Sequence, residues 1–339
     1  DTPTDAAHEL NTAILNVGIL TATTLYGDGS NLTNLVAGLT TDTYRNTSGG
    51  INALDSMTAG DATDNTAVGY DAGTAITTGD YNTAFGSYAL KATTTASHNT
   101  AIGYNTLLTN TTGGSNLAVG YDALKLNTTG DRNTALGVDS LQANTTANDN
   151  TALGYNTLAA NTTGTQNTAV GAYALDANTT DSYNSAVGYQ ALSANTTGEK
   201  NTAVGSFALR DNTTSDANTA LGSSALLVNT TGASNTAVGA YALDANTTAA
   251  NNTAVGHNAS TANTTGTENT TVGQNTLATN TTGSHNTALG SQALTANTTA
   301  SHNTAVGKDA LAANTTGAEH VAIGSRALQA NTTGADNTA

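Results

Sequence analysis

The 339-residue sequence has no cysteine, no tryptophan, one proline and one methionine. The absence of cysteine excludes a disulfide scaffold and any thiolate metal site, and a single proline excludes a collagen-like triple helix. Lysine and arginine total 8 against 24 aspartates and glutamates, so the net charge of −16 leaves little to neutralise phosphates, and no nucleic-acid partner is expected. No apolar run approaches the ~18 residues of a membrane span, so membrane insertion is not expected either.

Bulky side chains are also scarce. Aromatic residues make up 4% of the chain and charged residues 9%, while the hydrophobic 37% is largely alanine. An ordinary core needs large apolar side chains, because each one contributes only about 1.5–3 kcal/mol on burial. The low charge does not fit a typical disordered chain. The chain is therefore expected to gain order by repetition.

A 17-residue repeat begins at Asn65 and runs without insertion or deletion through sixteen copies, the last ending at Asp336. We number repeat positions from the leading Asn of each copy. Position 5 is Gly in all sixteen copies, position 4 is always Val, Leu, Ile or Phe, and position 9 is Leu in fourteen. Positions 13 and 14 are always Thr-Thr, and position 12 is Asn in the last fourteen copies.

Seventeen residues are too few for the helix pair of the helical repeat families, but they suffice for two short strands and two turns. The sequence therefore predicts an all-β fold, a parallel β-solenoid (β-roll) of 17-residue coils. Coils stacked at ~4.8 Å would make a rod about 75 Å long. One coil buries too little to fold alone, so hydrogen bonds along the stack and a second chain are expected to contribute.

Alternation along the strand assigns roles to the repeat positions. Thr168 and Val170 are predicted to share one face, with Val170 meeting Leu175 across a thin core. Ala169 and Gly171 fall on the other face, where such small side chains would either pack against further chains of a homotrimer or fit a narrow interior. The predicted core residues are Val68, Val119, Leu124, Val170, Leu175, Val187 and Leu192. Glycines predicted to permit tight turns or close approach are Gly69, Gly120, Gly171, Gly188 and Gly205. An asparagine ladder bracing the turns is predicted for Asn127, Asn144, Asn161, Asn178 and Asn195.

Three segments are expected. Residues 1–40 form an acidic, extended or strand-like start. Residues 41–64 form a transition with a degenerate capping coil at Ala53-Leu54, and residues 65–339 form the rod. The missing N-terminal Met and the last, unfinished repeat indicate a piece of a longer chain.

Two families resemble these residues. The coil N-T-A-V-G-x-x-A-L is similar to the head repeat of YadA-like trimeric autotransporter adhesins, which implies a trimeric left-handed β-roll on a bacterial surface. The NTAxG…NTTG array and residues 18–35, GILTATTLYGDGSNLTNL, resemble the tail fibres of bacteriophages, which implies a homotrimeric virion fibre. The expected function is a non-enzymatic extracellular shaft of a phage tail fibre that helps attachment to a host-surface glycan or receptor. The alternative is a bacterial surface adhesin or extracellular filament.

Aromatic residues at position 6 or 7 are candidates for surface binding. Tyr presents a flat apolar face with a hydroxyl, so a ladder of rings could stack on sugars or could simply cover gaps between coils or chains. The candidates are Tyr70, Tyr104, Tyr121, Tyr155 and Tyr189.

Other chemistry is weakly supported. Fourteen Asn-Thr-Thr sequons from Asn110 to Asn331 would leave no room for glycans at ~4.8 Å spacing. The adjacent Thr-Thr pairs lack the Thr-x-Thr spacing of ice-binding solenoids. His285 and His302 share position 17, but the sequence contains no His-x-His pair of the kind that would indicate a metal site. No nucleophile–base constellation recurs, so neither an enzyme nor a cofactor is expected.

Overall fold

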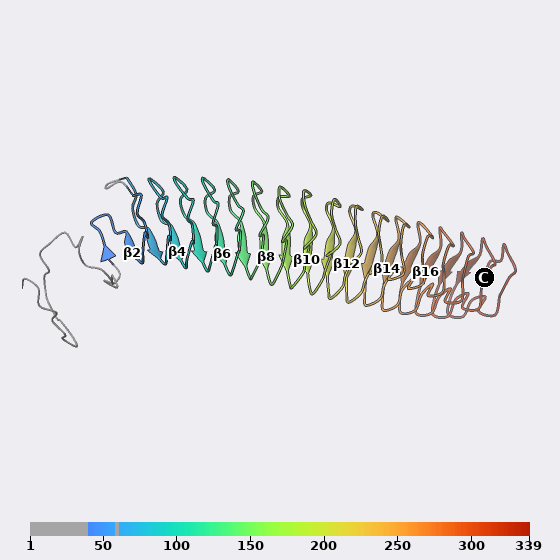
Figure 1. Ribbon diagram of the computed structural model, residues 1–339. Helices are drawn as coiled ribbons and strands as arrows, with labels where there is room; N and C mark the ends of the chain where they lie inside the picture. Colours follow the sequence, from blue (N-terminus) through green and yellow to red (C-terminus); the bar gives the residue numbers. More distant parts are fainter. Residues whose placement is uncertain (1–39, 58–60) are drawn as a thin grey trace, which may run out of the picture. The chain divides into compact units, whose positions relative to one another are not determined.

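The computed structural model describes residues 40–57 and 61–339, and the regular structure within these ranges is β throughout. The predicted parallel β-solenoid of 17-residue coils is confirmed (Figure 1). The start predicted for residues 1–40 lies, except for its last residue, outside the described residues. The strands are β1 (Thr40–Thr41), β2 (Thr47–Gly49), β3 (Thr66–Val68), β4 (Thr83–Phe85), β5 (Thr100–Ile102), β6 (Leu117–Val119), β7 (Thr134–Leu136), β8 (Thr151–Leu153), β9 (Thr168–Val170), β10 (Ser185–Val187), β11 (Thr202–Val204), β12 (Thr219–Leu221), β13 (Thr236–Val238), β14 (Thr253–Val255), β15 (Thr270–Val272), β16 (Thr287–Leu289), β17 (Thr304–Val306) and β18 (Val321–Ile323).

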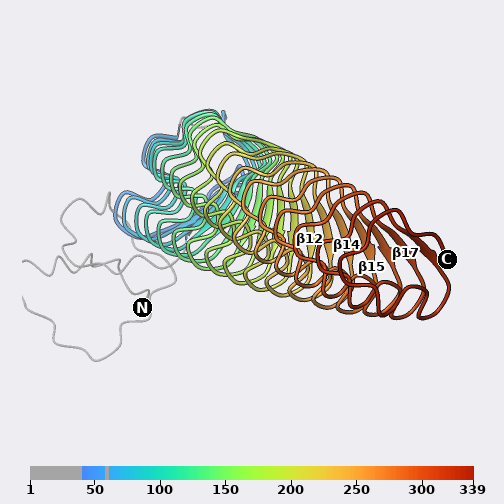
Figure 2. The same cartoon turned by 90° about the vertical axis from the view of Figure 1, so that its right-hand side faces the viewer.

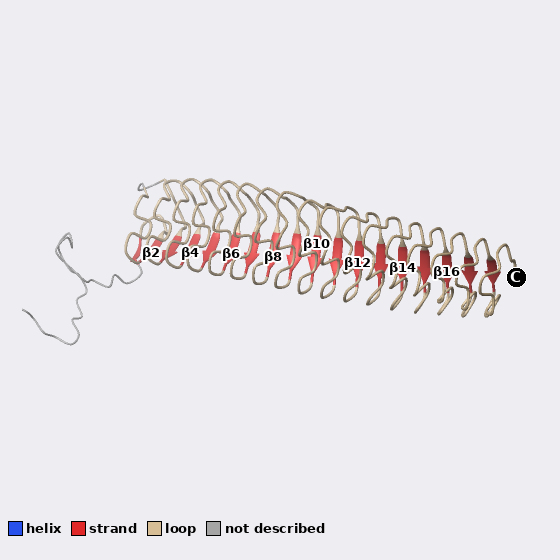
Figure 3. Cartoon of the chain, turned by 45° about the vertical axis from the view of Figure 1, so that its right-hand side comes forward, coloured by secondary structure: helices blue, strands red, loops and turns tan. Residues whose placement is uncertain are grey.

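One parallel sheet runs along the stack (Figure 3). Each strand from β2 to β17 pairs with the next in parallel, and the partners in the repeat are one period apart, as in Ala186 with Ala203. Only β1 differs, because it pairs antiparallel with β2. Figure 2 shows that successive coils follow nearly the same outline. A fixed period keeps every side chain on the same face in every coil.

Each coil holds one strand, not the two expected from its length. In the second half of the coil the backbone alternates into the left-handed region, with φ of +58° at Tyr173 and +52° at Leu175. This second half of the coil still forms hydrogen bonds along the stack, since the Leu175 N–H donates to the Ala191 carbonyl at 3.1 Å. Left-handed residues prevent a regular strand, so this half forms a chain of turns.

One more strand of the parallel sheet precedes the first copy of the repeat. Thr47 pairs with Thr66 across 19 residues, two more than the repeat period. Leu54 is buried and its N–H donates to the Ala72 carbonyl at 3.1 Å.

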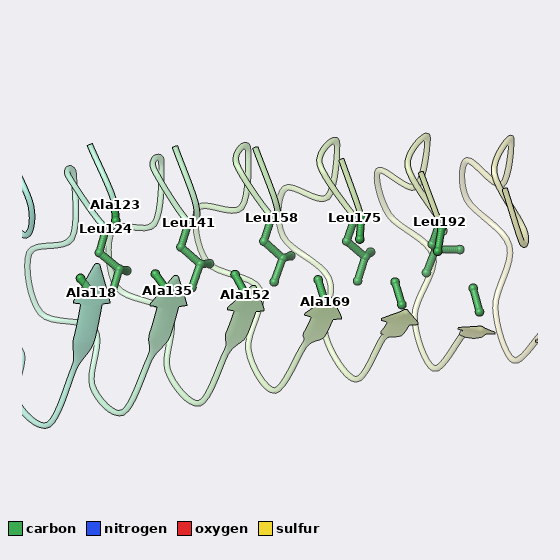
Figure 4. Close-up of a cluster of buried hydrophobic side chains, with 14 of the residues drawn as sticks. Ala118, Ala123, Leu124, Ala135, Leu141, Ala152, Leu158, Ala169, Leu175 and Leu192 are labelled. Carbon is green, nitrogen blue, oxygen red and sulfur yellow. The ribbon is translucent and has the colours of Figure 1, made fainter. Parts of the chain in front are cut away.

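The core consists of Ala and Leu. Ala169 at position 3, Ala174 at position 8 and Leu175 at position 9 are fully buried, and Figure 4 shows the strand alanines facing the leucines of the opposite wall. Leu124 and Leu192 lie in the same column. The interior is narrow, which is why the small residue of each strand points inward.

The valines predicted for the core are not in it. Val68, Val119 and Val170 are only half-buried and Val187 is 39% exposed, so the prediction for all four is wrong. The alternation itself is present, but its phase is inverted: position 3 points inward and positions 2 and 4 point outward. The Ala169 strip therefore fills the narrow interior and is not available for contact with another chain.

Two departures from the repeat are compensated nearby. Gly73 replaces the first position-9 Leu, and a side chain there would meet Leu54 and Ile76, which fill that space. Ser260 replaces a later Leu, and its hydroxyl lies 3.0 Å from that of Thr271, the one Thr at position 3. Both hydroxyls are buried and satisfied as a pair.

Candidate functional site

The asparagine column at position 12 forms a continuous buried ladder. The Asn144 amide donates to Asn127 Oδ1 at 2.8 Å and to the Ala147 carbonyl at 3.2 Å, and this pattern repeats coil after coil. The other predicted members, Asn161, Asn178 and Asn195, are fully buried and linked in the same way. A second ladder runs through position 1, where Asn82 N–H donates to Asn65 Oδ1 at 2.9 Å. Buried side chains of this kind are structural and cannot carry a glycan.

The glycine column at position 5 allows the coils to approach closely. Gly171, Gly188 and Gly205 have φ between +126° and +137°, a range that disfavours other residues. A Cβ on any of these three would lie 2.5 Å from the carbonyl oxygen of the next glycine in the column. Gly69 and Gly120 have φ of +141° and +138° and the same surroundings. The column has no room for a side chain except at its last member, Gly324, which no further glycine follows.

The outer face of the sheet is an uncharged surface that the sequence assignment missed. We call the outward residues of β3–β18, at positions 2 and 4, the Thr/Val face. Leu153, Leu221 and Leu289 on it are 45–47% exposed, and Phe85 is 56% exposed. Position 2 is Thr except at Leu117, Ser185 and Val321, and neither position carries a charge in any coil.

The sequence does contain an indication of this face. Position 3 is Ala in fifteen of the sixteen copies, whereas position 4 accepts side chains from Val to Phe. A packed interior tolerates little change in volume, so the nearly invariant small residue marks the inside and the variable apolar residue marks the outside.

Aromatic rings form two ladders just beyond the glycine column. The first ladder is Tyr70, Tyr88, Tyr104 and Tyr121, with centroids of successive rings 5.4–5.8 Å apart. The second ladder is Tyr155, Tyr173, Tyr189 and Phe207, with centroids 5.3–6.2 Å apart. Each predicted binding candidate, Tyr70, Tyr104, Tyr121, Tyr155 and Tyr189, occupies position 6 and is 44–51% exposed.

Paired charges lie beside the first ladder. Lys91 Nζ lies 3.0 Å from Asp71 and 4.6 Å from the centre of the Tyr88 ring. Hydrogen bonds from Asn52 and then Lys91 hold the pKa of Asp71 below its usual value. Lys125 lies 2.7 Å from Asp122, which also accepts a hydrogen bond from Asn105 at 3.0 Å. The rim of this ladder is polar with its charges largely balanced.

Every cation of the chain is close to a carboxylate. The eight Lys and Arg residues all lie in the described part and all have an Asp or Glu oxygen within 4.0 Å. Lys308 and Arg326 share the carboxylate of Asp309 at 3.9 and 4.0 Å, and the other six cations each have a carboxylate of their own.

The histidine column does not form a metal centre in this structure. His285 and His302 stack with centroids 4.8 Å apart, and Glu268 lies 3.2 Å from His285 Nδ1. Across the described residues, no group of three or more His, Asp or Glu is close enough to hold a metal ion. His320 is buried and replaces an Asn of the position-1 ladder, where its Nδ1 accepts the Asn337 N–H at 3.1 Å.

Two carboxylates in the coil of residues 167–183 are poorly accommodated. Asp176 Oδ1 and Asp181 Oδ2 are buried without a hydrogen-bond partner. Burial raises the pKa of Asp176. Burial, together with repulsion from Glu199 and Asp216, raises the pKa of Asp181.

Comparisons with known proteins add no identification. No family model, no curated protein and no solved structure matches the chain. Within residues 40–57 and 61–339, no helix is long and apolar enough to cross a membrane.

Proposed function

We propose that this chain is a non-enzymatic structural fibre, the shaft of a phage tail fibre that extends toward a host surface and helps attachment to it. The observation that supports this most is the unbroken register. Sixteen coils of equal length bond to their neighbours through sheet, asparagine and threonine columns that all run along the stack, as where Thr128 Oγ1 donates to the Thr145 carbonyl at 2.9 Å. Bonds aligned with the long axis resist bending and fraying.

We propose further that the shaft is a homotrimer whose chains meet through the Thr/Val face. Sixteen rows at ~4.8 Å and a width of about 10 Å give roughly 750 Å² per chain. Each chain of a trimer meets two neighbours, so each contact would use about half of this area, less than the ~800 Å² per partner of a standard interface but continuous along the whole rod. A monomer would leave this uncharged strip, with its exposed Val, Leu, Ile and Phe row, in water, and soluble monomers rarely expose apolar patches larger than a few hundred Å². An uncharged face of Thr and Val also suits contact between identical copies, because no like charges would meet.

The proposed location is the virion, outside the host cell. The support comes from residues 18–35 and from the NTAxG…NTTG array, which resemble tail-fibre sequences. A bacterial surface adhesin or extracellular filament would use the same rod on a cell surface. Binding of a ligand by the aromatic ladders of the isolated rod would favour this second candidate.

The assembly is tested by measuring the mass of the full chain by light scattering and its length by negative-stain electron microscopy. We expect three times the 33.6 kDa chain mass and a thin straight rod. Val187→Lys with Leu221→Lys should abolish the trimer, because both side chains lie on the Thr/Val face. The control, Thr180→Lys with Thr197→Lys, changes exposed position-14 residues and should leave the trimer intact. A monomeric parent, or equal effects of the two pairs, would refute this assembly.

A further inference from the structure

The aromatic ladders are not required by the fold. Coils without a ring keep the same backbone: φ is +56° at Ser224 and +61° at Gln292, against +58° at Tyr173. The ring also alternates between two positions, since Tyr104 stands at position 6 and Tyr173 at position 7. A residue needed for packing inside a coil would keep one position, so these rings serve something outside it.

The distribution of rings along the rod is uneven in a way that suggests a ligand. Eight of the first nine coils have one ring at position 6 or 7, and none has two. The coil of residues 133–149 interrupts the row with Val138 and Asp139, while residues 269–336 carry no Tyr or Phe. The first nine coils therefore carry two ladders of four rings. Beyond them, Tyr241 is the one further Tyr or Phe at these positions, and it lies 6.1 Å from the His257 ring.

The geometry of each ladder suits a long, thin, repeating ligand. Rings recur once per coil, at centroid spacings of 5.3–6.2 Å, which is about the length of one pyranose ring in a linear chain. Five of the six contacts between successive rings within the ladders are edge-to-face, with planes 75–89° apart, so neighbouring rings present both faces and edges along the row. Faces can stack on the C–H surfaces of sugars, while the tyrosine hydroxyls remain available for hydrogen bonds.

The charges beside the ladders select among sugar polymers. Asp71 and Lys91 neutralise each other, as do Asp122 and Lys125, and the chain carries a net charge of −16. An acidic polysaccharide or a nucleic acid would meet repulsion, and no unpaired cation lies beside the ladders to offset it. An uncharged polymer would meet aromatic faces flanked by polar groups.

We propose that the two aromatic ladders bind an uncharged linear polysaccharide that lies along the rod. This inference rests on the proposed fibre function and adds a ligand to its N-terminal coils. Each ladder would hold about four consecutive sugar units, and the ringless coil between them would let the two ladders engage one polymer or two.

The test measures binding of the full chain to insoluble cellulose, chitin and xylan, with immobilised alginate as the acidic comparison. The ladder variant carries Tyr104→Ser and Tyr121→Ser in the first ladder and Tyr155→Ser and Tyr189→Ser in the second. Ser223 and Ser291 already occupy position 6 in ringless coils. The matched control carries Tyr81→Ser and Tyr183→Ser. These tyrosines are 53% and 54% exposed but lie at position 17, outside both ladders.

We expect the parent to bind at least one uncharged polymer, the ladder variant to bind about tenfold more weakly, and the control to bind as the parent does. Failure to bind any uncharged polymer, binding to alginate alone, or equal losses in both variants would overturn the proposal. The mass and rod length of each variant are measured alongside. A correctly assembled rod that binds no sugar would refute the ladders as a site and leave the fibre function standing.

Discussion

Replacing Asp181 by glycine is expected to stabilise the coil of residues 167–183. Asp181 stands at position 15, which is Gly in ten of the sixteen coils. A Cβ at the equivalent Gly164 would collide with the Asp181 carbonyl oxygen. A coil with a side chain at position 15 must therefore shift relative to the next coil, and the shift changes the backbone hydrogen bonds between them.

The shift removes one backbone hydrogen bond between neighbouring coils. Where position 15 is Gly, the position-14 N–H donates to the next coil's position-13 carbonyl, as from Thr163 to Thr179 at 3.3 Å. In the six described coils where position 15 is not Gly, this bond is missing. The affected donors are Thr95, Thr146, Thr180, Thr214, Thr248 and Thr299.

The expected gain in the stability of this coil for Asp181→Gly combines three contributions. Restoring the bond from Thr180 adds about 0.5–1.5 kcal/mol, and removing the unpartnered carboxylate of Asp181 adds about 1–3 kcal/mol. The greater chain entropy of Gly subtracts about 0.5–1 kcal/mol. Asp181→Gly should therefore stabilise the coil by about 1–3 kcal/mol. Ala147→Gly restores the same bond without removing a charge, so its gain should be close to zero.

The pH dependence separates the two variants. Because the pKa of Asp181 is raised in the folded chain, the folded state binds the proton more tightly than the unfolded state does. Stability therefore falls as pH rises from the usual aspartate pKa through the raised value, and the penalty is fully present above the raised value. The advantage of Asp181→Gly should be largest at neutral pH and shrink in acid, whereas that of Ala147→Gly should not change.

The assay is hydrogen–deuterium exchange of the full chain, followed by peptide, at neutral and acidic pH. Local opening is the appropriate measurement, because long repeat arrays do not unfold as one two-state unit. Equal protection gains from Asp181→Gly and Ala147→Gly at neutral pH would refute the assigned cost of the carboxylate. Faster exchange in both variants would refute the link between Gly and the extra hydrogen bond.

Three further substitutions test the glycine column, the asparagine ladder and the hydrogen bonds at position 16. Gly188→Leu should break the register at mid-rod, because its Cβ would lie 2.5 Å from the Gly205 carbonyl oxygen; normal rods in electron micrographs would contradict this. Asn161→Ala should cost about 1–3 kcal/mol by leaving buried ladder partners unpaired, measured as faster exchange in the adjoining coils. Ala250→Ser should slow exchange of the Ala233 amide and add about 0.5–1 kcal/mol, since Ser284 Oγ accepts the equivalent N–H of Thr267 at 3.0 Å; unchanged exchange at Ala233 would contradict it.

The sequence predicted correctly what depends on the period of the repeat, and the interpretation was wrong where side-chain volume decides which face points inward. An unbroken 17-residue repeat requires in-register columns, so the solenoid, the close approach at Gly188 and the ladder at Asn161 follow directly from it. Alternation separates Thr168 and Val170 from Ala169 but does not say which side faces inward. That choice is decided by the width of the coil, which Leu175 on the opposite wall sets, and the sequence signal for it was the nearly invariant Ala at position 3.

The backbone conformation of the second half of the coil could not be predicted from the sequence pattern for a different reason. Leucine rarely adopts the left-handed region, yet Leu175 has a φ of +52° and equivalent leucines in the described coils do the same. The local cost of this conformation is offset by burial of the side chain and by a hydrogen bond along the stack, both of which come from neighbouring coils. Propensities within a 17-residue window do not include either contribution.

Compensation between coils indicates which unit of the sequence is under constraint. Ser260 and Thr271 belong to consecutive coils. The Thr271 hydroxyl donates to the Thr253 carbonyl at 3.2 Å, and the Ser260 hydroxyl, which would otherwise be unpaired in an apolar column, lies 3.0 Å from it. The constraint therefore acts on the contact between two coils and not on one 17-residue motif. A nearest-neighbour description of stability follows, in which interior coils share two interfaces and end coils one. In such a rod a weak coil, such as that of residues 167–183, limits cooperativity only locally, so an occasional Asp181 is tolerated where a bulky residue in the glycine column would not be.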